Sequence, residues 1–331
     1  MKPLKFIILI IILVLFYTGC NVESEKIRVI LDTDANNELD DQHAIAYLMF
    51  SGNYFDVEGI TVNKTENGGN VKLNYQEAER VIKLCNQYPE IKIYTGANGT
   101  FEEIKDHVTE SDFDGCNAVN FIISRAKANS NRRLVLIPIG KLTNIALALY
   151  KDPSIASNVR IVWLGSNYPE PGEYNQVNDL SSLKYILDVN VDFEIVTVRY
   201  GKSSGTDAVR ASLSDIEEIM PGMGPNILDP VIGRHGGSFT NFGDYSVNLF
   251  KNIDLVGDPP SRALFDMAAI AIIKNSSWAN PSKIPCPKLD GDNWIERPEN
   301  PHKIILWENF EKDKIILDFY STMKNYVLVR Q

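Results

Sequence analysis

The sequence has 331 residues, of which 44% are hydrophobic and 23% charged, and its formal net charge at pH 7 is -10. This acidic balance argues against nucleic acid as a partner, because phosphate binding requires concentrated lysine and arginine. No linker-like, repeated or low-complexity stretch divides the chain, so its length fits one large domain better than two. Three cysteines beyond residue 20 form neither a CxxC metal signature nor a disulfide framework.

The first 19 residues are typical of a secretion signal. A basic start precedes an apolar run over residues 6–17, which is too short to cross a bilayer comfortably as a helix. The small residues before Cys20 make this segment similar to a bacterial lipoprotein signal, with an ordinary secretion signal or an uncleaved anchor as the alternatives. We therefore expect an exported protein that is lipid-anchored to a bacterial membrane at Cys20. Residues 20–26 would form a short tether and residues 27–331 a single domain.

Short apolar runs alternate with helical patterns along most of the chain. We expect strands over residues 28–31, 55–62, 91–94, 134–138, 159–164 and 193–198. We expect helices over residues 42–49, 75–85, 118–127 and 142–150. This alternation predicts an α/β fold with a mostly parallel, Rossmann-like central sheet and helices on both faces. In such sheets ligands bind beyond the carboxyl ends of the strands.

The sharpest signal follows the first expected strand, where five acidic residues fall within ten positions, 32–41. Two like charges about 4 Å apart repel by roughly 4 kcal/mol at an effective dielectric near 20. The cluster therefore requires a cation, outward-turned members or protonated members. Oxygen ligands without His or Cys favour Ca²⁺ or Mg²⁺ over zinc. Asp40 and Asp41 could also cap the following helix, which would explain one of them but not the whole set.

The run Asp32-Thr33-Asp34, followed by Asp40-Asp41 and a helix of small residues, resembles the signature of nucleoside hydrolases, usually Asp-x-Asp-Pro-Gly-x-Asp-Asp. An Ala-Asn pair stands where that signature has Pro-Gly, and two extra residues precede Asp40. The chain is thus similar to a divergent member of this family, of the inosine/uridine-preferring type.

Three further segments resemble the same family, in the same order along the chain. Residues 139–146 are similar to its Gly-x-Leu-Thr-Asn segment after a central strand. Asn167, Glu173 and Asn175 reproduce its Asn-x5-Glu-x-Asn spacing. The run 265–268 is similar to the segment whose Asp completes the calcium shell. Each match alone could be a loop Asn, a surface Glu or a capping Asp, but four in order argue against coincidence.

The resemblance implies a calcium-dependent enzyme that hydrolyses the N-glycosidic bond of ribonucleosides to free base and ribose, using metal-activated water. It implies Asp34, Asp41, Asp266 and the backbone carbonyl of Ile139 as calcium ligands, with Asp34 also acting as the general base. The residues that it implies for the ribose hydroxyls are Asp40, Asn70, Asn167, Glu173 and Asn175. Attack by water without a protein nucleophile would invert the anomeric centre.

The residue before Asp266 differs from the one that many family members have. Phe265 stands where many family members have a histidine that protonates the departing base. None of the four histidines occupies a recognisable acid position, and we expect His43 to pack inside the first helix. His235 falls in residues 233–258, a stretch rich in Gly, Asn and Ser that predicts a long loop, either a lid or a disordered surface segment. Phe265 could instead stack on a base, which leaves the base preference open.

Other functions remain compatible with the sequence. One is hydrolysis of a different ribosyl-like glycoside, and another is a catalytically silent sugar- or nucleoside-binding lipoprotein. Retention of Asp34 argues against pure binding. A calcium-stabilised structural domain would not need the Asn167, Glu173 and Asn175 set. The substrate would be a small-molecule nucleoside or related glycoside, and a homo-oligomer is possible. We expect the cysteines at 85, 116 and 286 to be buried thiols, with oxidation of one pair in an exported protein as the alternative.

Overall fold

The computed structural model describes residues 25–330. The expected signal segment, its lipidated Cys20 and the first part of the tether lie outside the described residues, so these expectations stay predictions. Among residues 25–330, no helix combines the length and the apolar character needed to cross a membrane.

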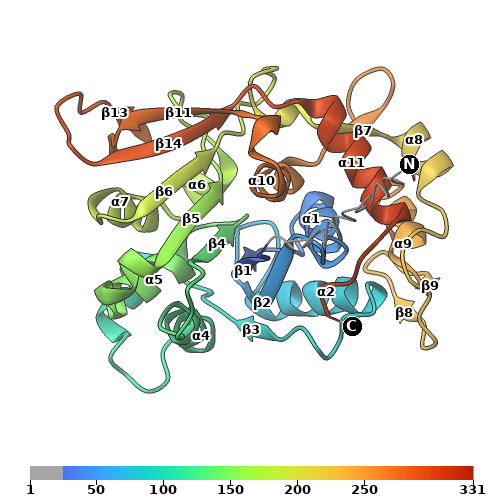
Figure 1. Ribbon diagram of the computed structural model, residues 1–331, viewed down its shortest axis with the longest axis horizontal. Helices are drawn as coiled ribbons and strands as arrows, with labels where there is room; N and C mark the ends of the chain where they lie inside the picture. The colour runs from blue at the N-terminus through green and yellow to red at the C-terminus, as the bar shows by residue number, and fades with distance from the viewer. Residues whose placement is uncertain (1–24, 331) are drawn as a thin grey trace, which may run out of the picture.

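An eight-stranded sheet forms the centre of the molecule (Figure 1). In spatial order its strands are β11 (Asn280–Pro285), β14 (Lys303–Glu308), β6 (Asp192–Val196), β5 (Val159–Leu164), β4 (Leu134–Pro138), β1 (Ile27–Thr33), β2 (Phe55–Val62) and β3 (Ile93–Thr95). Neighbouring strands are parallel throughout, except for the edge pair of β11 and β14, which is antiparallel. The mostly parallel sheet expected from the sequence is therefore confirmed, with β14 and β11 as unexpected additions.

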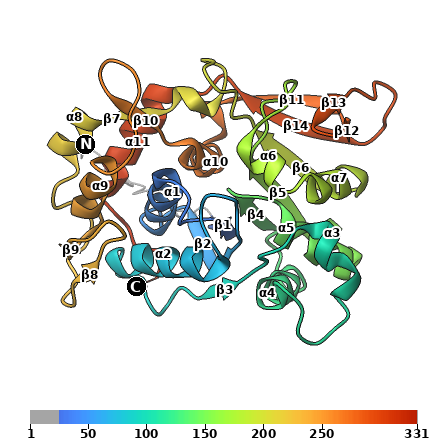
Figure 2. The ribbon, with the colours of Figure 1, turned by 180° about the vertical axis from the view of Figure 1, so that it is seen from behind.

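Helices cover both faces of this sheet. One buried apolar cluster contains Val29 and Leu31 of β1, and a second contains Ile30, because successive side chains of a strand point to opposite faces. The first cluster includes residues of α1 (Leu39–Met49), α2 (Val71–Leu84), α9 (Phe242–Phe250), α10 (Phe265–Lys274) and α11 (Lys312–Lys324). The second includes residues of α3 (Phe101–Ile104), α4 (Cys116–Ala126), α5 (Thr143–Lys151) and α7 (Leu180–Asp188). Figure 2 shows the two layers from behind.

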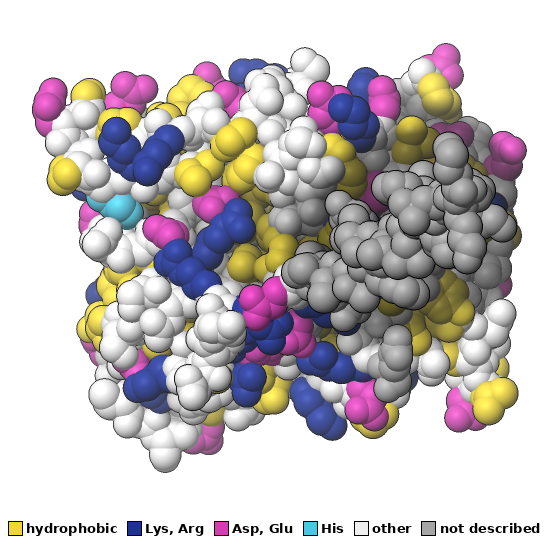
Figure 3. All heavy atoms as spheres, in the orientation of Figure 1, with side chains coloured by type: hydrophobic (Ala, Val, Ile, Leu, Met, Phe, Trp, Pro, Cys, Tyr) yellow, Lys and Arg dark blue, Asp and Glu magenta, His cyan; other side chains and the backbone are white. Residues whose placement is uncertain are grey.

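Two short α-helices and three two-stranded sheets lie outside the central sheet and the helices that cover it. They are α6 (Tyr174–Asn178), α8 (Leu213–Ile219), the pair β7 (Arg210–Ser212) and β10 (Ser261–Ala263), the pair β8 (Val231–Ile232) and β9 (Ser238–Phe239), and the pair β12 (Lys288–Asp290) and β13 (Asn293–Ile295). On the face seen in Figure 3, acidic and basic side chains are interspersed among neutral ones.

The expectation of a long loop over residues 233–258 is wrong for the middle of that stretch, which forms α9. The Asn241 side chain caps this helix by accepting a hydrogen bond of 2.8 Å from the Asp244 N–H. Phe242, Tyr245 and Leu249 recur at helical spacing and are buried. The Gly, Asn and Ser residues around the helix are typical of loops, so the helical spacing of its apolar residues was not recognised in the sequence.

His43 is buried in α1, as expected, and its ring lies 2.7 Å from the Ser246 hydroxyl and 2.6 Å from the Leu39 carbonyl. The three cysteines between residues 25 and 330 are free thiols. Cys85 and Cys286 are buried as expected, whereas Cys116 is partly exposed.

Candidate active site

A cavity of about 300 Å³ opens beyond the carboxyl ends of four parallel strands. Asp34 follows β1, Ile139 follows β4, Leu164 ends β5 and Val198 follows β6, and all four line the cavity. The chain builds β2 and β3 on one side of β1 and then β4 to β6 on the other, so the strand order reverses between β1 and β4. The cavity therefore lies at the point of an open α/β sheet where ligands usually bind.

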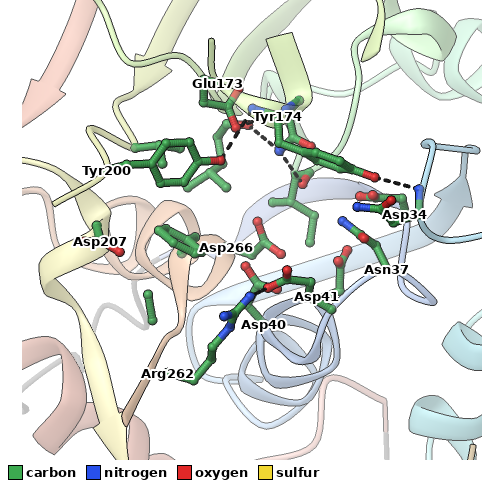
Figure 4. A pocket seen from close by; sticks show the side chains of 18 of the residues that line it. Asp34, Asn37, Asp40, Asp41, Glu173, Tyr174, Tyr200, Asp207, Arg262 and Asp266 are labelled. Carbon is green, nitrogen blue, oxygen red and sulfur yellow. Dashed lines mark hydrogen bonds and ion pairs between the residues drawn. The ribbon is translucent and has the colours of Figure 1, made fainter. Parts of the chain in front are cut away.

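Three carboxylates from two helix N-termini form one wall of this cavity. Asp40 and Asp41 lie in the first turn of α1, and Asp266 lies in the first turn of α10. All three are buried, and they offer oxygen atoms that lie within 4.8 Å of one another. Figure 4 shows them pointing into the same space. The N-cap residue of α1 is Glu38, so side-chain capping by Asp40 or Asp41 does not explain the cluster.

Burial makes this cluster electrostatically costly in its ionised form. Desolvation raises the pKa of Asp34 to about 7 and that of Asp40 to about 8. Burial, followed by repulsion from neighbouring carboxylates, also raises the pKa of Asp41 and of Asp266 well above the ordinary range. A bound cation would remove this cost by neutralising the negative charges, and a donor set of oxygens alone fits a hard divalent ion.

Asp34 is held in place from two sides. The Thr65 hydroxyl donates a hydrogen bond to its Oδ2. On the other side, a Cβ atom at Gly140 would lie 2.5 Å from its Oδ1, so only glycine leaves room for the carboxylate. Thr33 similarly donates to the Asp41 carboxylate. Threonine hydroxyls from the end of β1 and from the loop after β2 therefore orient the acidic groups.

Asp32 has a different role from its neighbours in the acidic segment. It is completely buried and accepts hydrogen bonds from Thr61 (2.5 Å), Asn63 (2.6 Å) and Asn144 (2.7 Å). These donors come from β2, from the loop after it and from α5. Asp32 does not line the cavity and instead ties together the elements beneath it.

The opposite wall contains Glu173 and Asn175, at the start of α6. Glu173 is the N-cap of this helix, and its carboxylate accepts backbone N–H groups of Ser166 (2.8 Å), Asn175 (3.0 Å) and Gln176 (2.8 Å). A carboxylate has about four acceptor positions, so one stays free for a ligand. Asn175 donates its amide to the Ile139 carbonyl at 3.0 Å, and that oxygen keeps a second lone pair.

Two residues expected at the site do not line the cavity. Asn70 is exposed, and its side chain caps α2 by accepting a hydrogen bond from the Leu73 N–H at 3.2 Å. Asn167 accepts a hydrogen bond of 3.2 Å from the Tyr200 N–H, and so links two loops beside the cavity. The other expected residues, Asp34, Asp40, Asp41, Ile139, Glu173, Asn175 and Asp266, all line it.

Several lining residues were not expected from the sequence. They include the aromatic residues Tyr174 and Tyr200 and two arginines of the β7–β10 pair, Arg210 and Arg262. Arg262 forms an ion pair with Glu38. Tyr174 lies between the two motif residues Glu173 and Asn175, so its place in the cavity could have been predicted from the sequence. The arginines stand in no motif and reach the cavity only through the tertiary fold.

Phe265 is among the residues that line the cavity. The Phe265 ring meets the Tyr200 ring edge to face, with 5.9 Å between the centroids. None of the four histidines, all within residues 25–330, lines the cavity. His235 lines an adjoining cavity of about 250 Å³, which shares Asn37, Glu38 and Asn67 with the first.

The model of one protein family, described as inosine-uridine preferring nucleoside hydrolase, matches residues 29–277. The chain belongs to this family. It is therefore a nucleoside N-ribohydrolase, an enzyme that hydrolyses ribonucleosides. Nucleoside hydrolases depend on a metal ion, and the buried carboxylates of α1 and α10 fit that requirement.

One similar sequence and two similar solved structures show how far the resemblance extends. A probable uridine nucleosidase of Oryza sativa subsp. japonica is 25% identical over an alignment of 206 residues, and the match covers 54% of this chain and 61% of the relative. The solved structure of a plant nucleoside hydrolase, PpNRh1, has a TM-score of 0.69 at 16% identity and covers 91% of this chain and 99% of its own. An inosine-uridine preferring nucleoside hydrolase from Bacillus anthracis has a TM-score of 0.64 at 15% identity, with 90% and 99% covered. At these identities the structural likeness shows the fold alone.

Proposed function

We propose that this nucleoside hydrolase cleaves the N-glycosidic bond of ribonucleosides to free base and ribose in a calcium-dependent reaction. One observation carries the proposal: three buried carboxylates converge within 4.8 Å on one wall of a cavity whose opposite wall presents Glu173 and Asn175. The first wall suits a divalent cation, and the second suits the hydroxyl groups of a sugar.

The donor set supports calcium as the ion. Asp41 and Asp266 of the carboxylate cluster would hold it together with Asp34 and the Ile139 carbonyl, which line the same cavity, whereas Asp40 would face the sugar. All of these ligands are oxygen donors. Calcium accepts six to eight oxygen ligands in flexible geometry, whereas magnesium usually keeps several waters and binds one or two carboxylates, as a rule beside phosphates. When bound, the ion would lower the pKa of water and hold it near the anomeric carbon.

Asp34 is the proposed general base. Its carboxylate is fixed by the Thr65 hydroxyl and by the close approach of Gly140, so it presents a defined acceptor to the attacking water. A fixed base within hydrogen-bond reach can take the proton of that water as the glycosidic bond breaks. The absence of a protein nucleophile from this scheme predicts inversion at the anomeric carbon.

Asp40, Glu173 and Asn175 are the proposed ribose ligands. Glu173 keeps an acceptor position for a hydroxyl donor, and its backbone hydrogen bonds hold the carboxylate rigidly. Such preorganised groups place the anomeric carbon against the water and stabilise the positive charge that develops on the sugar.

The leaving group is the feature that favours a second candidate. Phe265 and Tyr200 offer aromatic surface on which a base could stack, but neither side chain is an imidazole that could protonate the departing base. A glycoside whose leaving group departs without protonation would suit this cavity better than a glycoside whose leaving group must be protonated. Hydrolysis of a ribosyl-like glycoside other than a common nucleoside is therefore the alternative.

The variant Asp34→Asn distinguishes an enzyme from a silent binding protein. We expect kcat for nucleoside hydrolysis to fall by about 10²–10⁴-fold, the usual contribution of a general base. Because Asn keeps the shape of the side chain, ribose binding measured by calorimetry should change much less. If wild type and variant bind ribose equally and neither hydrolyses any nucleoside or activated riboside, the catalytic proposal fails.

A further inference from the structure

A short hairpin in the C-terminal part of the chain contacts the sugar-binding wall of the cavity, which is the wall that contains Glu173 and Asn175. It consists of β12 and β13, lies between β11 and β14 along the chain, and falls beyond residues 29–277, which the family model matches. Its tip contains Gly291, with a φ of 59°, and Asp292. The left-handed backbone at Gly291 allows the tight turn that brings Asp292 to the end of the hairpin.

Asp292 holds the segment around Glu173 at two points. Its Oδ2 accepts a hydrogen bond of 2.7 Å from the Gly172 N–H, and its Oδ1 accepts one of 2.6 Å from the Gln176 side chain. The Gln176 amide also donates to the Asp292 carbonyl at 3.1 Å. These contacts join residues more than a hundred positions apart and flank Glu173 and Asn175 on both sides.

A second residue of the hairpin supports the loop that leads into this segment. The Trp294 ring packs edge to face on Tyr168, with 5.2 Å between the centroids and an interplanar angle of 75°. Tyr168 is fixed from its other side, because its carbonyl accepts a hydrogen bond of 3.0 Å from Arg199. The hairpin therefore contacts residues 168–176 near their start and at their end.

The sugar-binding wall needs such support because α6 is too short to order itself. This helix has five residues, and isolated helices shorter than about 12 residues are marginal in water. Gly172 has a φ of 84° and no neighbouring heavy atom within 4 Å of its ideal Cβ position, so the chain has conformational freedom just before Glu173. The backbone hydrogen bonds of Glu173 fix its carboxylate relative to α6, but the placement of the whole segment against the cavity must come from tertiary contacts.

We propose that Asp292 is a positioning residue, which acts through Gly172 and Gln176 to hold Glu173 and Asn175 against the sugar. This inference rests on the proposed function for its catalytic consequence, since Glu173 and Asn175 bind ribose only in that scheme. Asp292 does not line the cavity, and its side chain hydrogen-bonds to Gly172 and Gln176 and not to the carboxylates of α1 and α10. Its loss should therefore disturb sugar binding and leave the metal site intact.

The test compares Asp292→Ala with Asp292→Asn, which keeps an acceptor oxygen, and with Asp290→Ala. Asp290 is exposed on the same hairpin, so its replacement controls for general effects on β12 and β13. Hydrogen exchange of the backbone amides of residues 172–178 reports the order of the segment whether or not the protein is active. Steady-state kinetics on the nucleoside that the wild type hydrolyses best, and calcium titration of each metal-free protein, supply the other two readouts.

We expect faster amide exchange in residues 172–178 of Asp292→Ala and a rise in KM of about tenfold, which corresponds to ~1.4 kcal/mol. The fall in kcat should be smaller, calcium affinity should match the wild type, and Asp292→Asn should recover part of the loss. Unchanged exchange, an equal effect in Asp290→Ala, or a parallel loss of calcium affinity would overturn the inference. If the wild type hydrolyses no nucleoside, the proposed function fails by itself. The exchange data then decide whether Asp292 orders the segment.

Discussion

Gly140 and Asp34 fit together so closely that any side chain at position 140 would displace the Asp34 carboxylate. A Cβ atom at Gly140 would lie 2.5 Å from Oδ1 of Asp34 and 3.1 Å from both terminal side-chain atoms of Asn63. Gly140 follows β4 and Asp34 follows β1, so this contact joins the two adjacent strands at which the strand order reverses. The position of the proposed base is thus determined by a glycine more than a hundred residues away.

The variant Gly140→Ala should therefore lower kcat without unfolding the protein. The new methyl group would displace the Asp34 carboxylate, and a displacement of about 1 Å from the reacting geometry can reduce the rate on the order of 10²-fold. Initial rates on the best nucleoside substrate, with circular dichroism to verify folding, provide the measurement. Gly201→Ala is a matched control, because no atom lies within 4 Å of its ideal Cβ position, although its φ of 69° makes that variant slightly strained. Wild-type rates in Gly140→Ala would show that Asp34 needs no such exact placement.

Phe265 leads to a prediction about leaving groups. Because Phe265 stands where many family members have a histidine, and none of the four histidines, all within residues 25–330, lines the cavity, the wild type should cleave an activated aryl riboside, whose leaving group departs as an anion, much faster than a purine nucleoside. Phe265→His should reduce the ratio of the aryl riboside rate to the purine nucleoside rate by about tenfold or more, because a positioned acid contributes roughly 10²–10⁴-fold. Phe265→Leu removes the ring without adding a proton donor, and it should leave the difference unchanged. An equal reduction of this rate ratio in Phe265→His and Phe265→Leu would mean that the aromatic ring itself sets the preference for the aryl riboside.

A buried ion pair far from the cavity gives the protein a pH-dependent stability. Glu58, with 6% of its side chain exposed, accepts hydrogen bonds of 2.5 Å from Arg28 and from Arg125. Burial raises the pKa of this carboxyl group, but the two arginines outweigh that effect and lower the pKa below its ordinary value of 4.5. The folded protein thus takes up this proton less readily than the unfolded chain. The stabilisation is complete above pH 4.5 and is lost as the pH falls through the lower pKa of the folded state.

Glu58→Gln should accordingly reduce the free energy of unfolding by about 3 kcal/mol at pH 7, because it leaves the buried Arg28 without its anion. The difference from the wild type should shrink as the pH is lowered below 4.5, where Glu58 itself becomes protonated. Urea unfolding at a series of pH values measures both effects. Glu79→Gln is the surface control, since its partner Lys83 is 38% exposed, and it should cost at most about 1 kcal/mol. A difference that stays constant with pH would contradict the assignment to Glu58.

The sheet could be predicted from the sequence as far as β6 because each of its strands is a short apolar run with a helix or a loop on either side. The two strands beyond it were missed for different reasons. β11 contains Pro281 and Pro285, which lack an N–H donor and argue against a strand, and it lies at the edge of the sheet where proline is tolerated. β14 is an apolar run, but its place beside β6 follows from the tertiary fold and not from the chain order.

The candidate site was predictable where a motif fixed both the residue and its element. Asp40, Asp41 and Asp266 lie in the first turns of α1 and α10, so the direction of their side chains follows from these helices. Asn70 also begins a helix, but its side chain turns back to the Leu73 amide, a choice that spacing alone does not reveal. Arg262 stands in no motif and reaches the cavity through the pairing of β10 with β7, and Asp292 reaches the loop before α6 through hydrogen bonds across the fold.

The most direct test of the account is the release of free ribose from a panel of purine and pyrimidine nucleosides by the purified protein, with and without a chelator. We predict release that stops when the chelator is added, returns with calcium and returns less fully with equimolar magnesium. Release that the chelator does not affect would contradict the role of Asp34, Asp41 and Asp266 as metal ligands. A calcium-loaded protein that releases no ribose from any nucleoside would contradict the proposed reaction.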